Sequence, residues 1–377
     1  MGSRFAKLGL TVALLGGLAA GVHAQPAPAP VAASTAGETQ LPHKEGDFVV
    51  RDFRFRDGQT LPEVRLHYTT LGEPKRDAHG NIVNAVMVLH GTGGDGHQFF
   101  RSQFAGVLFV PGGLLDIRKY YIILPDDVGH GKSSKPSDGL HMRFPHYDYA
   151  DMVDLEHILA DQGLGVKQLR LIMGTSMGCM HAFVWGENHP DAVKALQPMA
   201  CAPLRITGRN RIWRAALIDA IKSDPQWMGG EYKTEPTGAL RTASALLMIA
   251  GSAPIQMRHS YPTPEAGEAY LADYTAHELA TLDANDLIYQ FDSSRDYDPE
   301  PNLEKIKVPV MWINSADDFI NPPDLKVEDQ VLHRNAHIHF VDVPASLETH
   351  GHGTHTWAPV WKDHLAELLQ ESGGPVS

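Results

Sequence analysis

Residues 169–188 read LRLIMGTSMGCMHAFVWGEN, and this stretch decides the fold. It begins with a short apolar run at 169–173, and a helical spacing of apolar residues follows at 180–189. Between them, GTSMG at 174–178 has the G-x-S-x-G pattern in the strand–turn–helix context that a nucleophile elbow requires. The helix N-terminus then directs backbone N–H groups toward the reacting oxygen. We predict that Ser176 is a nucleophile; a chance match to the pattern is the alternative.

The sequence around this elbow predicts a mostly parallel sheet covered by helices. Further continuous apolar runs are typical of strands that are buried on both faces. They lie at residues 85–89, 120–124, 195–199, 308–313 and 338–343. Helical patterns at 149–161 and 359–371 alternate with them, which predicts an α/β fold. Residues 47–71 alternate apolar and polar residues around a DGQ turn, and they predict an antiparallel pair at the sheet edge.

One long interval, residues 204–301, lacks strand patterning and contains helical stretches at 212–222 and 239–249. A connection of this length predicts an inserted helical cap between strands six and seven. The predicted organisation has five parts. They are a signal peptide at 1–24, a Pro/Ala-rich leader at 25–40, the first part of the α/β core at 41–203, the cap at 204–301 and the second part of the core at 302–377.

The first 24 residues have the layout of a secretory signal peptide. Arg4 and Lys7 precede an apolar run at 8–22, and the segment ends in the small residue Ala24. We therefore expect a periplasmic or secreted protein with no membrane association after cleavage; an uncleaved N-terminal anchor is the alternative. The 377-residue chain has a net charge of −13, which argues against a nucleic-acid partner.

A glycine-rich turn, HGTGG at 90–94, closes the strand at 85–89. Such a turn can present N–H groups to an oxyanion, and ligands bind beyond the carboxyl ends of strands in these sheets. The predicted oxyanion donors are the backbone N–H groups of Thr92 and Met177; a phosphate-binding loop is the alternative interpretation. The loop at 126–133 contains His130, for which we favour a structural turn over a catalytic role.

A serine nucleophile of this kind needs an acid and then a histidine later in the chain. Asp317 and Asp318 follow the apolar run at 308–313, and we favour Asp318 because it lies four residues before Pro322. The other aspartate is expected to be solvated or bonded to the loop.

The base is expected among His350, His352 and His355, which follow the apolar run at 338–343. We favour His352, which has glycine on both sides, with His355 second and His350 third. The three histidines could instead bind zinc, but a serine elbow already requires one of them, so we expect no metal and no cofactor.

The two cysteines, Cys179 and Cys201, are too few for a disulfide scaffold. An exported protein could pair them. We favour two buried, unpaired side chains.

From about residue 46 to 369, the chain resembles the α/β-hydrolase superfamily and, within it, the homoserine O-acetyltransferase-like branch. The motifs that carry the resemblance include the following: LHGTGG at 89–94, GTSMGCMHAFVWGENHPD at 174–191, GRNRIWRAALIDAIKSDPQWMGGEY at 208–232, DANDLIYQFDSSRDYD at 283–298, SADDFINPP at 315–323 and GHG at 351–353. The resemblance implies an α/β-hydrolase fold with Ser176 as nucleophile, Asp318 as acid and His352 as base. A homodimer through the cap is a further expectation by analogy.

Two features differ from the acyltransferases of this branch: the segment at 126–139 is shorter, and Cys179 stands where they usually have glycine. Those enzymes also take their acyl group from acyl-CoA, which is cytosolic, whereas an exported enzyme meets water as the abundant acceptor. We therefore predict an exported serine hydrolase that acts on a small acyl substrate, an ester, lactone or amide. An acyl-CoA-dependent O-acyltransferase and a non-catalytic periplasmic binder on the same fold are the alternatives.

Overall fold

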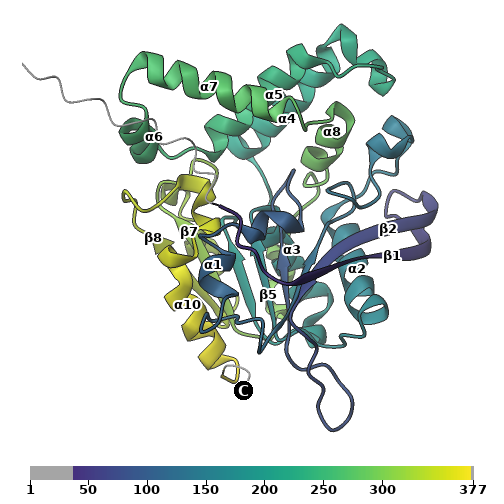
Figure 1. Cartoon of the computed structure of the whole chain (residues 1–377), viewed down its shortest axis with the longest axis vertical. Coiled ribbons are helices and arrows are strands. Elements are labelled where there is room, and N and C mark those ends of the chain that lie inside the picture. The colour runs from purple at the N-terminus through teal and green to yellow at the C-terminus, as the bar shows by residue number, and fades with distance from the viewer. Residues whose placement is uncertain (1–36, 375–377) are drawn as a thin grey trace, which may run out of the picture.

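The computed structural model describes residues 37–374, so the predicted signal peptide lies outside the described residues. Eight strands form one sheet in the order β1-β2-β4-β3-β5-β6-β7-β8. They are β1 His43–Arg54, β2 Thr60–Leu71, β3 Ala85–Leu89, β4 Tyr121–Pro125, β5 Leu171–Thr175, β6 Leu196–Met199, β7 Val310–Ser315 and β8 Ile338–Val343. The β1–β2 pair and its contact with β4 are antiparallel, and all other neighbours are parallel. The predicted α/β fold with an antiparallel pair at one edge is confirmed (Figure 1).

Apolar side chains cover both faces of the sheet, and β3 shows how. Val86 and Val88 point into one apolar cluster, while Met87 and Leu89 point into another. The first cluster is completed by α1 and α10, and the second by α2 and α3. These helices are α1 Ala105–Leu108, α2 Tyr149–Ile158, α3 Met177–Asn188 and α10 Ala358–Glu371. Because helices bury both faces, the central strands have continuous rather than alternating apolar sequence.

The structure corrects three details of these sequence expectations. β5 continues through Thr175 and α3 starts at Met177, so the turn between them is Ser176 alone. The helix expected at 149–161 ends at Ile158 and continues as one wider turn, Leu159–Gly163. The run at 338–343 is not buried on both faces, because β8 is an edge strand whose middle residues are partly exposed.

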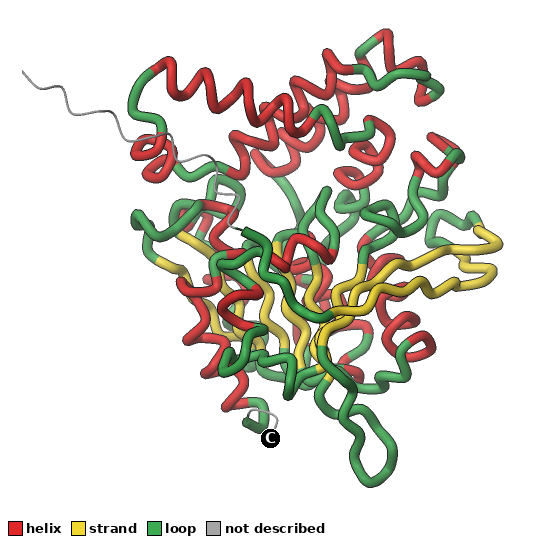
Figure 2. Tube along the Cα trace, in the orientation of Figure 1, coloured by secondary structure: helices red, strands yellow, loops and turns green. Residues whose placement is uncertain are grey.

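Five α-helices lie between β6 and β7, which confirms the inserted helical cap. They are α4 Gly208–Ser223, α5 Thr237–Gly251, α6 Pro254–Ser260, α7 Pro264–Glu278 and α8 Ala284–Asp292. The cap has its own apolar cluster, in which Leu217 and Ile221 of α4 pack against Leu240 of α5 and Leu287 of α8. Figure 2 shows these helices gathered above the sheet. A further short helix, α9 Val327–Val331, lies in the chain between β7 and β8.

In the described part of the chain, no single helix is long and apolar enough to span a membrane. α5 and α6 meet the length and hydropathy criteria only as a pair, and the two are bent by 107°.

Candidate active site

Ser176 stands alone between β5 and α3 in a strained backbone conformation, with φ 56° and ψ −105°. A positive φ is costly for a residue with a Cβ atom, and such strain concentrates at functional sites. The turn is held by its own backbone, since the Ser176 N–H donates to the Met199 carbonyl at 2.9 Å. The sharp bend therefore presents the Ser176 hydroxyl at the carboxyl edge of the sheet.

The two glycines of the elbow are required by close backbone approach. A Cβ atom on Gly174 would lie 1.9 Å from the carbonyl oxygen of Gly178. One on Gly178 would lie 2.4 Å from the carbonyl oxygen of Leu89. The G-x-S-x-G spacing thus lets α3 pack directly against β5 and β3.

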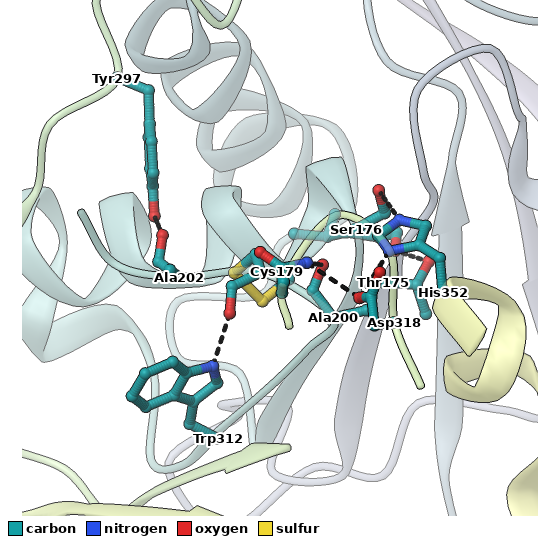
Figure 3. The surroundings of a disulfide bond; sticks show 12 residues. Thr175, Ser176, Cys179, Ala200, Ala202, Tyr297, Trp312, Asp318 and His352 are labelled. Atoms are coloured by element: carbon teal, nitrogen blue, oxygen red, sulfur yellow. Dashed lines mark hydrogen bonds and ion pairs between the residues drawn. A yellow bond between two sulfur atoms is a disulfide. The ribbon is translucent and has the colours of Figure 1, made fainter. Parts of the chain in front are cut away.

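The structure brings together the three residues that the sequence singles out. The Nε2 atom of His352 lies 2.8 Å from the Ser176 Oγ, and its Nδ1 atom lies 2.9 Å from Asp318 Oδ2. A carboxylate can only accept, so Nδ1 carries the hydrogen and Nε2 accepts from the serine hydroxyl. Figure 3 shows this continuous chain from carboxylate to hydroxyl, which has the connectivity of a Ser-His-Asp triad.

The loop after β7 holds Asp318 as a buried anion. Its carboxylate accepts from the Ile320 N–H at 2.7 Å and from the Asn321 side-chain amide at 3.0 Å. Burial alone would raise the pKa of Asp318, but His352 and these donors together hold it below its ordinary value. Asp317 points elsewhere, and it accepts from the hydroxyls of Ser315 and Thr349.

The two neighbouring histidines have other surroundings. His350 stacks on Trp357 with ring centroids 3.7 Å apart. His355 is buried against His352, and burial lowers its pKa to about 3. Their ring nitrogens do not converge on a common point with His352 in the part of the chain that the structure describes, so the three-histidine zinc interpretation does not fit the geometry.

The glycine-rich turn after β3 lies against the nucleophile. A Cβ atom on Gly91 would be 3.3 Å from the Ser176 Cβ and 3.9 Å from its Oγ. Thr92 follows directly, and Met177 is the first residue of α3. Among the described residues, the N–H groups of Thr92 and Met177 have no hydrogen-bond acceptor. One predicted oxyanion donor thus follows the glycine that contacts Ser176, and the other follows Ser176 itself in the chain.

Ser176 and His352 open into a cavity of about 330 Å³ beneath the cap. The cap contributes Asn210 and Arg214 from α4, and the loop after β7 contributes Ile320. A volume of this size suits a small molecule and sits at the lower end of the usual range for ligand pockets.

Cys179 and Cys201 form a disulfide, so the preference for two unpaired cysteines is wrong. Their Cα atoms are 5.9 Å apart because the first turn of α3 packs against the chain that leaves β6. The adjoining carbonyls are also bonded: that of Cys201 accepts from the Trp312 indole at 2.7 Å, and that of Ala200 from the Asn321 side chain at 3.1 Å. Figure 3 shows Cys179, Ala200 and Trp312 in this region. The nucleophile helix, the end of β6 and the Asp318 loop are thereby joined.

A buried polar network behind the elbow was missed by sequence reasoning. The Nδ1 atom of His181 on α3 lies at hydrogen-bond distance, 2.6 Å, from a carboxyl oxygen of Glu156 on α2, and the Asp127 carboxyl lies 3.6 Å from the same nitrogen. Burial raises the pKa of Glu156 to about 7 and that of Asp127 well above its ordinary value. These three could hold a metal ion by donor type, but the 2.6 Å separation is that of a hydrogen bond and is shorter than two ligands on one ion would show. Asp127, Glu156 and His181 lie on three separate elements, so no spacing in the sequence indicates that they meet.

His130 lies in the same region, and it contacts His90 with ring centroids 5.0 Å apart. It is buried, burial lowers its pKa well below the ordinary value, and its side chain is not part of the cavity lining. The structure therefore places it in a turn beneath the site.

Comparisons with known proteins bear on the fold of the chain. A family model described as "alpha/beta hydrolase fold" matches residues 84–345. A probable acyltransferase from Methanothermobacter thermautotrophicus is 29% identical over 281 residues, which cover 74% of this chain and 84% of that protein. A homoserine O-acetyltransferase from Thermobifida fusca is 33% identical over 194 residues, which cover 48% of this chain and only 49% of that protein.

Among solved structures, an acetylester hydrolase from Corynebacterium glutamicum superposes with a TM-score of 0.75. The match covers 87% of this chain and 96% of that one, with 20% sequence identity. At this identity the likeness shows a shared fold.

Proposed function

This chain belongs to the alpha/beta hydrolase fold family, and on that premise we propose that it is an exported serine hydrolase that cleaves a carboxylic ester or a related acyl bond. The observation that carries the proposal is the continuous hydrogen-bonded chain from Asp318 through His352 to Ser176 at the base of a small cavity. Such a chain activates a serine hydroxyl for attack on an acyl carbonyl.

The geometry supports a two-stage mechanism. Ser176 Oγ attacks the substrate carbonyl while His352 Nε2 takes its proton, and Asp318 stabilises the resulting imidazolium. The N–H groups of Thr92 and Met177 are proposed to bind the tetrahedral oxyanion. When the intermediate collapses, the imidazolium returns the proton to the departing alcohol and leaves an acyl-enzyme. Water then attacks the acyl carbon, with His352 as base, and releases the acid and Ser176.

Export favours water as the acyl acceptor over an acyl-CoA-dependent exchange. The n-region, apolar run and small residue of the first 24 residues support this placement. The Cys179–Cys201 disulfide supports it independently, because disulfides persist in oxidising compartments outside the cytosol.

Acyl transfer is the second candidate, and the relatives named acyltransferases favour it. Both reactions share the acyl-enzyme and differ only in what removes the acyl group. Incubation with acyl-CoA and a set of hydroxyl acceptors distinguishes them by the ratio of acylated product to free acid. Free acid in excess supports the hydrolase, and acylated product in excess supports the transferase.

The direct test is a panel of esters, lactones and amides assayed with the wild type and Ser176→Ala in parallel. We expect turnover of the best substrate to fall by a factor of about 10⁴ or more in Ser176→Ala. Circular dichroism checks that the fold is retained. Equal turnover by the two proteins contradicts the proposal, and a wild type without turnover and unreactive toward a fluorophosphonate supports a binding protein.

A further inference from the structure

Arg214 of α4 is a buried cation in the wall of the cavity that contains Ser176 and His352. Only 2% of its surface is exposed. A guanidinium remains charged in proteins, and removing it from water is unfavourable unless an anion faces it.

The partners of Arg214 are neutral. Its Nε donates to Asn210 Oδ1 at 2.9 Å, and its Nη1 donates to Ser294 Oγ at 3.3 Å. Its guanidinium carbon lies 5.1 Å from the centroid of the Trp213 ring and 5.5 Å from that of Phe291. Within residues 37–374, no carboxylate forms an ion pair with Arg214. Two of its five N–H groups are thus engaged by Asn210 and Ser294, and the charge itself is not balanced.

Other arginines near this cavity do have acidic partners. Arg205 pairs with Asp298 at 2.6 Å, and Arg211, on the same helix as Arg214, pairs with Asp292 at 3.2 Å. Glu300 is the only acid among the described residues that line the cavity, and it pairs with Arg334 at 2.9 Å. Among the residues that the structure describes, these acids therefore already have basic partners, and Arg214 is the arginine of the cavity lining that lacks an acidic one.

The cation is also close to the reaction centre. Arg214 lines the same cavity of about 330 Å³ as Ser176 and His352. A substrate group held at Arg214 belongs to the same small molecule that Ser176 attacks.

We propose that the cavity selects esters that carry a carboxylate, and that Arg214 binds this carboxylate while Ser176 attacks the ester carbonyl. The inference rests on the proposed hydrolase activity and narrows it to a substrate class. The carboxylate of the substrate would be the acidic partner that Arg214 lacks in the protein. The planar guanidinium can donate two parallel hydrogen bonds to such a carboxylate. The overall acidic charge of −13 does not draw anions in from a distance, so the preference arises within the cavity.

Two matched substrate pairs test the preference without any variant. Monomethyl glutarate and dimethyl glutarate differ by a charge on the acyl side. 4-Acetoxybutanoate and its methyl ester differ by a charge on the alcohol side. At pH 7.5 we expect the charged member of at least one pair to have a kcat/KM about tenfold higher per ester bond, or more. No preference for the charged member in either pair overturns the inference.

Arg214→Gln identifies the residue responsible. We expect the ratio of kcat/KM for the charged member to that for the neutral one to fall about tenfold or more, with Arg214→Lys intermediate. Arg211→Gln is the matched control, because it removes a paired cation from the same helix, and the ratio is expected to change less than about threefold. An equal loss for both substrates in Arg214→Gln would instead assign Arg214 to the general chemistry and contradict the inference.

Binding gives a readout independent of turnover. Glutarate is expected to raise the melting temperature of Ser176→Ala and to leave that of Ser176→Ala/Arg214→Gln unchanged. An equal shift in both proteins contradicts the inference. The proposed function itself fails if Ser176→Ala retains turnover, whereas a Ser176-dependent enzyme without charge preference refutes the Arg214 assignment alone.

Discussion

Asp317 and Asp318 are adjacent in the chain, yet only one of their carboxylates faces the histidine. Asp318 is 2% exposed, and it accepts from His352, Asn321 and the Ile320 N–H. Asp317 instead accepts from two hydroxyls that close the loop. One carboxylate thus orients the catalytic imidazole and the other ties the loop together.

This difference predicts distinct effects of two isosteric substitutions. Asp318→Asn is expected to lower kcat by about 10⁴, because an amide does not fix the imidazole tautomer that accepts the serine proton. Asp317→Asn, the matched control, is expected to change kcat by less than about threefold. The measurement is ester turnover at pH 7.5 with both variants. Equal losses in the two would show that the acid has been assigned to the wrong residue.

The sequence predicted some site residues firmly and others only among neighbours. Ser176 follows from local spacing, because a strand, a tight turn and a helix are all encoded within twenty residues. His352 had to be chosen from three histidines, since which imidazole reaches the serine depends on how the loop after β8 folds. Arg214 carried no signal, because its lack of an acidic partner depends on contacts with residues far along the chain.

At the scale of elements, the elbow depends on how α3 is fixed to its neighbours. Glycines allow α3 to approach β3 and β5, and the Cys179–Cys201 disulfide joins α3 to the end of β6. The same chain segment bonds to Trp312 and Asn321. Sequence patterning located the strands and the cap, but it could not show that two cysteines 22 residues apart meet.

The disulfide is expected to stabilise the fold measurably. Closing a loop of this size contributes about 3 kcal/mol by restricting the unfolded chain. Reduction with dithiothreitol should therefore lower the melting temperature of the wild type. The double variant Cys179→Ala/Cys201→Ala is the control, and its melting temperature should not respond to reductant. A wild type that keeps its melting temperature after both thiols have been titrated contradicts this expectation.

At the scale of the whole molecule, two titratable groups on α3 act in opposite directions on the pH dependence of stability. Burial lowers the pKa of His181 to about 4. Below about pH 6.5 this histidine is protonated in the unfolded chain but stays neutral in the folded one, so protonation favours unfolding. Stability therefore rises with pH up to about pH 6.5. Burial, offset only in part by Lys305, raises the pKa of Glu187 to about 8. Between its unfolded value of 4.5 and pH 8, the folded state holds a proton that the unfolded state has lost, so this group lowers stability as pH rises.

Above pH 7 the unfolded chain no longer protonates His181, so stability stops rising on account of this group. Glu187 continues to lower stability up to about pH 8. We therefore expect the melting temperature to fall between pH 7 and pH 8.5. Glu187→Gln should reduce this fall, because the amide does not ionise, while Glu268→Gln at an exposed position should preserve it. Calorimetry of the three proteins across this range provides the measurement. A fall of the same size in Glu187→Gln would show that other groups control it.

The two central features, a serine in a strained turn and a histidine bonded to it, predict one reactive hydroxyl per chain. The most direct measurement is mass spectrometry of the protein after treatment with a fluorophosphonate. We expect one adduct per chain, located by peptide mapping at Ser176, and no adduct in Ser176→Ala or after heat denaturation of the wild type. A wild type that stays unlabelled, or an adduct that persists in Ser176→Ala, would contradict the assignment of this site as the catalytic centre.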